Sequence, residues 1–261
     1  MKLKSVSIVG FGRFGQTFAK LLNADFKLTI FNRSKIKKSS IKLLKTAKIT
    51  EKISEVYLNN AVFYCVPISE FEKVIELHSK YFRNNLLIDT LSVKEYPEKI
   101  FKKVRLRRSF TAILTHPMFG PDSAKESFDN LPMIVSNFNA SNETYRKWIN
   151  YFKNKKLKVI EMTARNHDKL AAHSQGLTHF IGRLLQIYKF KPSSIDSVGA
   201  KKMLELMDQV CNDSWKLYGD LQKYNPYSKD MAKRLDVAFE KLHKKTFKDL
   251  KQVKSVKHFM L

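Results

Sequence analysis

His116 is the residue whose setting in this sequence best suits acid–base chemistry. It lies between the apolar run 110–114 and a loop that contains Pro117, Gly120 and Pro121. Because a residue before proline favours extended backbone angles, and the prolines stiffen the loop, the imidazole is held in a fixed direction. Histidine has the side-chain pKa nearest neutrality, so such an imidazole suits a general base or acid. On this segment alone, a buried histidine bonded to a backbone carbonyl explains the residue equally well.

A glycine motif near the amino terminus has the spacing of a dinucleotide-binding turn. The β-branched run 6–9 leads into G-F-G-R-F-G, and residues 13–22 then carry apolar side chains at helical spacing. A strand, Gly-x-Gly-x-x-Gly and a helix together bring backbone N–H groups and a positive helix end to a pyrophosphate. A tight turn without a ligand is the alternative. We expect cofactor contacts from Gly10, Phe11, Gly12, Arg13, Phe14 and Gly15.

The end of the next predicted strand, residues 28–31, indicates which dinucleotide is bound. NAD-selective folds commonly carry Asp or Glu there to bind the ribose 2′-hydroxyl. This chain has Asn32, Arg33 and Ser34, followed by lysines at 35, 37 and 38. An arginine, a hydroxyl and nearby lysines would bind a 2′-phosphate, which a carboxylate would repel. The pattern predicts NADP, with an ordinary basic turn as the alternative.

Further strands are predicted at residues 61–66, 86–88, 110–115, 131–135 and 157–160, with helices at 69–81, from about 93, and at 142–152. In an open α/β sheet, ligands lie beyond the carboxyl ends of the strands. We therefore expect residues 65–68 and 89–92 to line the nicotinamide side, with Cys65, Val66 and Pro67 at the cofactor and Ser92 at the same edge. Ser92 could also be the N-cap of the helix that begins near residue 93. Residues 1–163 are predicted to form this dinucleotide-binding domain.

From residue 164 onward the pattern is helical. Helices are predicted at 166–190, 194–211, 214–224 and 228–256, broken at Pro192 and Pro226. The predicted fold class is thus α/β, a Rossmann-type domain followed by an all-α domain at residues 164–261. A helical domain in this position commonly closes a substrate pocket and forms a homodimer.

Three polar residues share one face of the first helix in this second domain. Gln175, His179 and Arg183 recur every four residues, so they span an arc of about 80°. A strip facing solvent is one explanation. The other is a substrate-binding face, with an arginine for a carboxylate and a histidine for a hydrogen bond, opposite His116 across a cleft.

Composition limits the classes of protein considered. The net charge of +25 suggests a polyanionic partner, but the excess is spread over most of the chain and no nucleic-acid motif accompanies it. A lysine-rich solvated surface is favoured, and no specific nucleic acid is expected. Cys65 and Cys211 lie far apart and form no metal-ligand spacing, which predicts no metal site and fits a reducing compartment. With no apolar run of about 18 residues and no leader pattern at residues 1–15, we expect a soluble, cytoplasmic protein without membrane association.

Six segments resemble the prephenate/arogenate dehydrogenase family, and most closely its plant-type arogenate branch. They occur in family order over nearly the whole chain: V-G-F-G-R-F-G (9–15), D-T-L-S-V-K-E (89–95), T-H-P-M-F-G-P-D-S (115–123), H-D-K-L-A-A-H-S-Q-G-L-T-H-F-I-G-R (167–183), N-D-S-W-K-L-Y (212–218) and R-L-D-V-A-F-E (234–240). The glycine motif is generic. The histidine-proline loop and the S-Q-x-x-T-H-x-x-G-R helix are specific.

The resemblance implies oxidative decarboxylation of a cyclohexadienol. The ring carbon that bears the hydroxyl gives a hydride to the nicotinamide, and loss of carbon dioxide makes the ring aromatic. The resemblance assigns His116 as the base for the ring hydroxyl proton, with Ser92 hydrogen-bonded at the same place. A base must lie within hydrogen-bond reach of the proton it removes, which agrees with the placement from the residues alone.

The resemblance also implies a substrate-binding set, namely Ser174, Gln175, His179 and Arg183. Many bacterial members have a carboxylate-binding arginine where this chain has Gln209, which leaves that role to Arg183. His173 stands where plant-type sequences tend to have a small residue, and it is given no role.

Asp122 is the residue expected to distinguish the two family substrates. Arogenate carries an ammonium where prephenate carries a keto group, so a nearby carboxylate would favour arogenate. An aspartate that caps the loop is an equal alternative. We predict an NADP-dependent homodimeric enzyme that converts arogenate to tyrosine. Prephenate dehydrogenase, giving 4-hydroxyphenylpyruvate, is the alternative in the same class, and a non-catalytic NADP- or nucleic-acid-binding protein is the alternative from another class.

Overall fold

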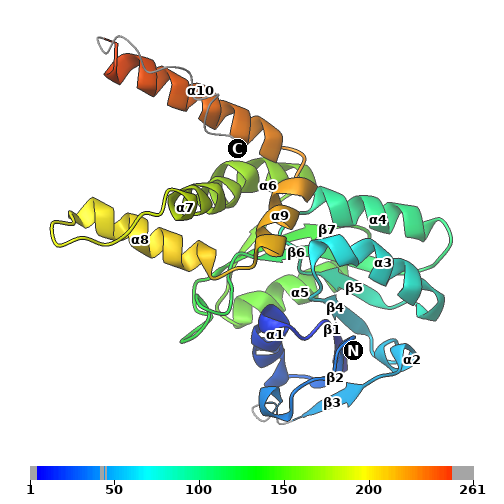
Figure 1. The fold of residues 1–261 in the computed structure, drawn as a ribbon. Helices are drawn as coiled ribbons and strands as arrows, with labels where there is room; N and C mark the ends of the chain where they lie inside the picture. The colour runs from blue at the N-terminus through cyan, green and yellow to red at the C-terminus, as the bar shows by residue number, and fades with distance from the viewer. Residues whose placement is uncertain (1–4, 42–43, 45, 249–261) are drawn as a thin grey trace.

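The centre of the molecule is one eight-stranded sheet with helices on both faces (Figure 1). The structure is a computed structural model that describes residues 5–41, 44 and 46–248. The strands are β1 (Ser5–Val9), β2 (Lys27–Phe31), β3 (Ala47–Thr50), β4 (Ala61–Tyr64), β5 (Leu86–Asp89), β6 (Thr111–Pro117), β7 (Pro132–Asn137) and β8 (Lys158–Glu161). Their order in the sheet is β3-β2-β1-β4-β5-β6-β7-β8.

Helices connect the strands and continue beyond the sheet. Before β8 lie α1 (Arg13–Asn23), η1 (Lys38–Ser40), α2 (Ile53–Val56), α3 (Ile68–His78), η2 (Ser79–Tyr81), α4 (Glu95–Arg105) and α5 (Asn142–Asn154). After β8 lie α6 (Ala164–Ala171), the π-helical turn η3 (Ala172–Gly176), α7 (Leu177–Ile187), α8 (Val198–Cys211), α9 (Trp215–Tyr224) and α10 (Ser228–Thr246).

The sheet is buried on both faces. Strands β4 and β5 are buried along their whole length, as expected of central parallel strands covered on each side. Helices α1 and α5 pack on one face through residues such as Phe18 and Trp148. Helices α3 and α4 pack on the other face through residues such as Phe71 and Phe101. This arrangement and the helical part that follows confirm the predicted fold class.

Three details of the strands differ from the prediction. The strand expected at 61–66 ends at Tyr64, and the short strand β3 was not predicted. Strand β6 continues through His116 and Pro117 and pairs antiparallel with β7, so that His116 lies opposite Ile134. Residues 118–131 form no crossover helix between β6 and β7, and a parallel pairing needs such a crossover. His116 is therefore held by a strand ladder instead of a loop.

The helices differ in two respects. The helix expected from residue 93 begins at Glu95, and its N-cap is Lys94 instead of Ser92. The helix expected at 166–190 is a run of α6, η3 and α7 that contains one π-helical turn. The predicted end of the last helix at residue 256 lies outside the described residues.

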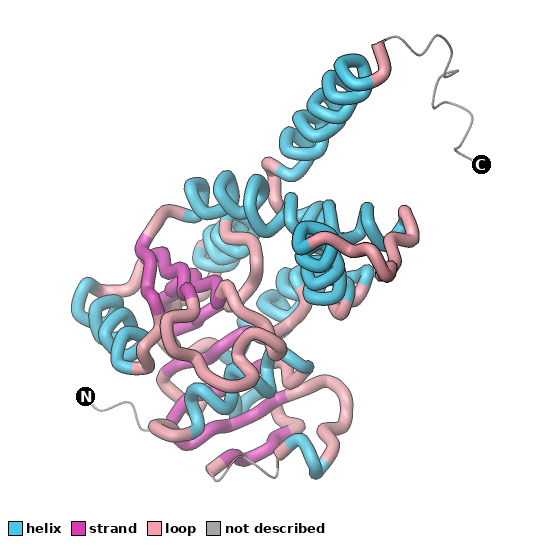
Figure 2. Tube along the Cα trace, turned by 90° about the vertical axis from the view of Figure 1, so that its left-hand side faces the viewer, coloured by secondary structure: helices cyan, strands magenta, loops and turns pink. Residues whose placement is uncertain are grey.

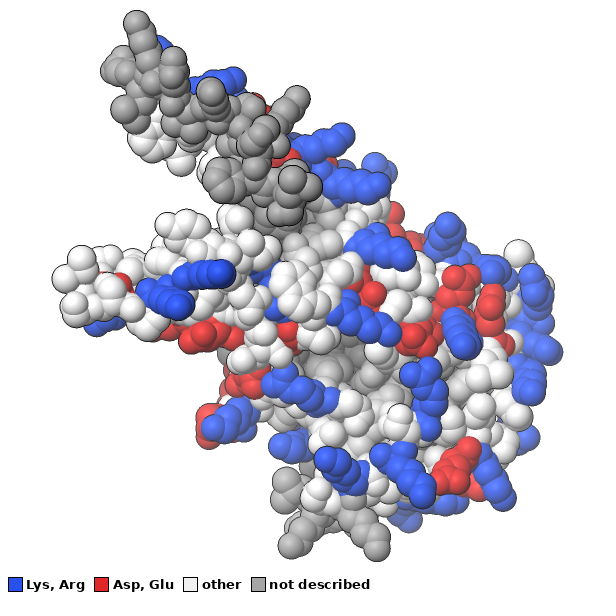
Figure 3. All heavy atoms as spheres, viewed as in Figure 1, with Lys and Arg blue, Asp and Glu red and all other residues white. Residues whose placement is uncertain are grey.

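The helical part packs beside the carboxyl edge of the sheet, and α10 projects away from the rest of the molecule (Figures 1 and 2). Within residues 5–41, 44 and 46–248, no helix has the length and apolar character needed to span a membrane. On the face in Figure 3, Lys and Arg side chains are scattered over the surface with Asp and Glu among them. This distribution fits the solvated basic surface expected from the sequence.

A buried polar cluster lies in the core between the sheet and α3. The hydroxyl of Tyr57 lies 2.7 Å from the hydroxyl of Tyr64 and 2.8 Å from Nδ1 of His78. His78 is 2% exposed. Burial removes hydration from the charged imidazole and so lowers the pKa of His78 from 6.5 to about 4.

This depressed pKa predicts a loss of stability in weak acid. The unfolded chain binds a proton at His78 below pH 6.5, whereas the folded protein does so only near pH 4. The contribution is therefore complete above pH 6.5 and is lost as the pH falls towards 4. Between pH 7.5 and pH 5 we expect the free energy of unfolding to fall by about 2 kcal/mol through this group.

The measurement is urea unfolding of the wild type and of His78→Gln at both pH values. Glutamine can still bond to Tyr57 but does not titrate, so its free energy of unfolding should change less with pH by about that amount. The same pH dependence in both proteins would contradict the role given to His78.

Candidate active site

The glycine turn after β1 has the geometry of a ligand-binding loop. Gly10 has a φ of +96°, and a Cβ there would lie 2.5 Å from the carbonyl oxygen of Cys65. A Cβ on Gly15 would lie 2.2 Å from the carbonyl oxygen of Gly10. A Cβ on Gly12, in contrast, would have no described atom within 4 Å. The first and third glycines thus allow close packing, and the second leaves open space at the start of α1.

The amino terminus of α1 is suited to bind an anion. Its N-cap, Gly12, makes no side-chain hydrogen bond, and its first turn contains no acidic residue. The first N–H groups of a helix have no partner within the helix, and the helix dipole adds a partial positive charge. The open space at Gly12 therefore fits a phosphate group.

The residues expected at the ribose lie next to this turn. Asn32 accepts a hydrogen bond from the N–H of Phe11 at 2.9 Å and donates one to the carbonyl of Ser34 at 2.9 Å. Arg33 and Ser34 are exposed, and Arg33 forms an ion pair with Glu70 at 3.3 Å. Asn32 thus holds the two loops together, while Arg33 is at the surface.

The residues expected after β4 lie behind the glycine turn. The N–H of Cys65 bonds to the carbonyl of Val9 at 2.8 Å. Burial raises the pKa of the Cys65 thiol to about 12, so the group is neutral. Val66 is half-buried, its side chain would lie 3.0 Å from a Cβ on Gly10, and Pro67 is exposed.

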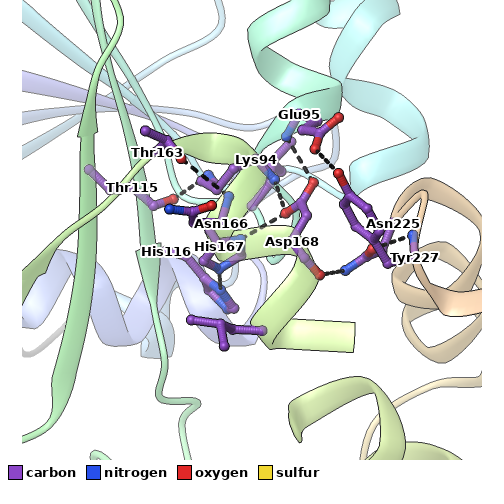
Figure 4. A network of polar contacts seen from close by, with 12 residues as sticks. Lys94, Glu95, Thr115, His116, Thr163, Asn166, His167, Asp168, Asn225 and Tyr227 are labelled. Atoms are coloured by element: carbon purple, nitrogen blue, oxygen red, sulfur yellow. Dashed lines mark hydrogen bonds and ion pairs between the residues drawn. The ribbon is translucent and has the colours of Figure 1, made fainter. Parts of the chain in front are cut away.

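His116 is buried at the carboxyl edge of the sheet and bonded to a second histidine (Figure 4). It is 2% exposed, and its Nδ1 lies 2.8 Å from Nε2 of His167 on α6. Nδ1 of His167 lies 2.7 Å from Oδ1 of Asp168. Burial, with the nearby charge of Lys94, holds the pKa of His116 well below its usual value. The neutral form can therefore accept a proton.

Asp168 joins this histidine pair to the start of α4. Its Oδ1 accepts a hydrogen bond from the N–H of Lys94 at 2.7 Å, and its Oδ2 accepts one from the N–H of Glu95 at 2.9 Å. The Asp168 carbonyl accepts a bond from the Asn225 side chain at 2.9 Å. A carboxylate at a helix amino terminus is favourable. This cap fixes the helix that follows the Ser92 loop.

A fully buried ion pair lies beneath the same site. Lys94 is 0% exposed, and its ammonium group donates to the carboxylate of Asp89 and to the carbonyl of Thr115. The N–H of Thr115 donates to Asp89 at 3.2 Å. Burial raises the pKa of Asp89 and lowers that of Lys94, and their mutual attraction opposes both shifts. The pair ties the end of β5 to the residue just before His116.

Ser92 and His116 come from adjacent strand ends. Strands β5 and β6 pair in parallel, with Asp89 opposite Leu114, and the two residues follow shortly after these positions. Ser92 is half-buried. The sheet thus brings the two predicted catalytic residues to neighbouring places on one edge.

The polar face formed by Gln175, His179 and Arg183 is partly buried. Arg183 is 3% exposed, donates to Gln186 at 2.8 Å and to the carbonyl of Asp213, and its guanidinium lies 4.4 Å from the ring centre of Trp215. Gln175 and His179 are half-buried, so this face is not a fully solvated strip. Burial lowers the pKa of His179.

One atom of each of these three side chains lacks a partner in the described chain. These buried atoms are Oε1 of Gln175, Nδ1 of His179 and Nε of Arg183. Buried polar atoms are nearly all hydrogen-bonded in folded proteins, so such a cluster indicates a place for a polar ligand. No hydrogen bond or ion pair links it to His116 within residues 5–41, 44 and 46–248. The facing arrangement expected across a cleft therefore stays a prediction.

The remaining residues considered from the sequence make their contacts outside this polar cluster. Asp122 forms an ion pair with Arg13 of the glycine turn at 3.0 Å, so it does not simply cap its own loop. The hydroxyl of Ser174 donates to the carbonyl of Leu170 at 2.8 Å, and Ser174 is exposed. His173 lies 3.7 Å from Asp230, and Gln209 is exposed on α8.

Sequence reasoning missed four residues of this site: Lys94, His167, Asp168 and Trp215. All four belong to the segments that carried the family resemblance, and this was the available signal. The described residues contain no cluster of three or more His, Cys, Asp or Glu side chains that could hold a metal ion.

A family model and curated relatives indicate one family for this chain. Residues 23–161 match the family model "Prephenate dehydrogenase, nucleotide-binding domain", and residues 184–258 match "TYRAAT1-like, C-terminal domain". The chain is 32% identical to arogenate dehydrogenase 2, chloroplastic, of Arabidopsis thaliana over 95% of this chain and 71% of that protein. It is 31% identical to arogenate dehydrogenase 1, chloroplastic, of the same plant over 93% of this chain and 39% of that protein.

Solved structures show the same fold. The crystal structure of prephenate dehydrogenase from Aquifex aeolicus, in complex with hydroxyphenyl propionate and NAD+, superposes with a TM-score of 0.73. It is 16% identical in sequence, and the match covers 96% of this chain and 93% of the other. At this identity the likeness shows the fold alone.

Proposed function

This chain belongs to the prephenate dehydrogenase family, and on that premise we propose that it converts arogenate to tyrosine by NADP-dependent oxidative decarboxylation. The observation that carries the proposal is the buried, neutral His116 at the same sheet edge as the glycine turn. The Arabidopsis relatives, which are named arogenate dehydrogenases, support arogenate as the substrate.

Residues at the glycine turn would hold the cofactor. The α1 amino terminus and the space at Gly12 suit the pyrophosphate, and Arg33 suits a 2′-phosphate once it leaves Glu70. When bound, the nicotinamide accepts a hydride from the substrate ring. An exposed arginine paired with one glutamate can exchange that partner for a phosphate at little cost.

His116 would act as the general base. Its neutral imidazole takes the proton of the ring hydroxyl, and the electrons of that O–H bond form the carbonyl as the hydride leaves. Ser92 would bond to the same oxygen. Loss of carbon dioxide then makes the ring aromatic. The low pKa of His116 keeps the imidazole unprotonated at neutral pH.

The cluster of Gln175, His179 and Arg183 would bind the polar side of the substrate. Each side chain has a buried atom without a partner in the described chain, and a carboxylate could accept from the guanidinium and the imidazole. The Trp215 ring beside Arg183 orients the guanidinium. In this division of roles, residues 1–163 bind the cofactor and residues 164–261 bind the substrate, with Ser174 on the same helical run.

The helical part would also form a homodimer. Leu235, Phe239 and Leu242 recur on one side of α10, and Phe239 and Leu242 are 62% and 64% exposed. Figure 1 shows that this helix projects from the rest of the molecule, so a second copy is the partner that could cover it.

Both cysteines are free, which fits a cytoplasmic location that cell fractionation can check.

The decisive assay measures NADPH or NADH formation with each of two cofactors and two substrates. We expect the highest kcat/KM with NADP and arogenate. A higher value with prephenate would assign prephenate dehydrogenase instead. No turnover in any combination, together with steeply salt-dependent nucleic-acid binding, would assign the non-catalytic alternative.

Arg33→Ala tests the choice of cofactor. Loss of one charge-assisted contact to the 2′-phosphate should raise the KM for NADP by about tenfold and leave that for NAD unchanged. Glu70→Gln is the matched control, because it frees Arg33 from its ion pair without removing the arginine. An equal effect of Arg33→Ala on both cofactors would reject the assignment.

Asp122→Asn tests the choice of substrate. If the carboxylate attracts the ammonium of arogenate, the ratio of kcat/KM for arogenate over prephenate should fall by about two- to fivefold, the scale of an exposed charge pair. Arg13→Gln is the control for the ion pair that Asp122 makes in this structure. An unchanged ratio in Asp122→Asn would contradict a role for Asp122 in the choice of substrate.

Phe239→Glu tests the dimer. A charge in the apolar stripe of α10 should shift the mass measured by light scattering from two chains towards one. Lys241→Glu is the control, because residue 241 lies about 200° around the helix from residue 239. A wild-type mass of one chain would contradict the dimer.

A further inference from the structure

We propose that His167 and Asp168 are positioning residues that fix the tautomer of His116, leave its Nε2 as the basic atom, and share the proton that it receives. The geometry that supports this is the unbroken series His116, His167, Asp168, with contacts of 2.8 Å and 2.7 Å (Figure 4). The assignment of the His116 tautomer does not depend on the proposed function. The assignment of Nε2 as the base for a substrate hydroxyl rests on the proposed function.

The tautomer follows from the end of the series. The Asp168 carboxylate accepts hydrogen bonds from the N–H groups of Lys94 and Glu95, so it acts as an acceptor towards His167 as well. Nδ1 of His167 must then carry a proton. In a neutral imidazole the other nitrogen is an acceptor, so Nε2 of His167 accepts a hydrogen bond from the Nδ1–H of His116. This leaves the lone pair of His116 on Nε2.

Burial favours this neutral arrangement over a charged one. His116 and His167 are each 2% exposed, and a buried imidazolium loses its hydration. The charged or titratable groups around the pair are Asp89 at the end of β5, Lys94 and Glu95 at the start of α4, and Asp168 on α6. Tyr227 bonds to Glu95 on the outer side. Lys94 opposes a positive charge on His116. The carboxylate of Asp168 lies 2.7 Å from Nδ1 of His167.

These charges give the second histidine a role during the reaction. When the substrate O–H bond breaks, its proton forms an N–H bond at Nε2 of His116. The proton on Nδ1 can then pass to Nε2 of His167, where the positive charge lies beside the carboxylate of Asp168. No proton is gained or lost in this transfer. The pair is therefore a stronger base than a single buried imidazole at the same place.

Two substitutions of His167 separate orientation from proton sharing. The side-chain oxygen of His167→Gln can accept from Nδ1 of His116 and keep the tautomer, but it cannot take the proton. His167→Phe keeps a ring of similar shape and removes both functions. Asp168 is a less useful site for substitution, because it also caps α4.

Nitrogen-15 NMR of histidine-labelled protein gives a direct readout. We expect the wild type to show His116 protonated on Nδ1 and unprotonated on Nε2 at neutral pH. His167→Gln should keep that tautomer, and His167→Phe should populate the Nε2–H form. A wild-type His116 protonated on Nε2 would overturn the proposal, whether or not the protein proves to be a dehydrogenase.

Kinetics give the second readout. We expect kcat to fall about a hundredfold in His167→Phe and about tenfold in His167→Gln, within the range of general base catalysis, with KM for the substrate changed less than about threefold. The acid limb of the kcat profile should move to lower pH in both, because the protonated pair is less stable. Unchanged kcat and an unchanged limb in His167→Phe would also overturn the proposal. Absence of wild-type turnover would reject the proposed function alone, and the NMR result would still decide the tautomer.

Discussion

The site depends on the partial positive charge of three helix amino termini that meet at the carboxyl edge of the sheet. Asp168 caps α4, and Asp220 on α9 caps α3 through the N–H and hydroxyl of Ser69 at 3.1 Å and 2.7 Å. Both carboxylates come from the helical part, so they dock it on the sheet. The α1 terminus has no such cap among the described residues. It is left to attract an anionic ligand.

The buried ion pair of Asp89 and Lys94 fixes the backbone geometry of the site rather than adding net stability to the fold. Removing two charges from water is costly, and their attraction compensates only with good geometry and further hydrogen bonds. Here those bonds go to backbone groups of Leu91 and Thr115. The pair thereby fixes the end of β5, which leads to Ser92, and the residue of β6 just before His116. An apolar pair could fill the volume but could not hold these backbone groups.

The parts of the site predicted from sequence are those encoded in a short continuous stretch. The glycine turn, the strand before it and the helix after it depend on neighbours within a few residues, so their pattern was sufficient. The polar face of Gln175, His179 and Arg183 followed from helical spacing. The cap on α4 was missed because its carboxylate, Asp168, lies more than seventy residues from Lys94. The partner of Asp122 was missed for the same reason. The positions of residues along the sequence do not show that Asp122 contacts Arg13, which is more than a hundred residues away.

Arg13 shows how these parts can act together. It belongs to the glycine turn, pairs with Asp122 beyond β6, and its other guanidinium nitrogen lies 3.4 Å from the carbonyl of Asn212 after α8. One side chain thus touches the cofactor turn, the loop that follows His116 and the helical part. These contacts are exposed and individually weak, so a bound phosphate can compete for the guanidinium. A phosphate bound at the turn would therefore compete with Asp122 and with the carbonyl of Asn212 for the same guanidinium.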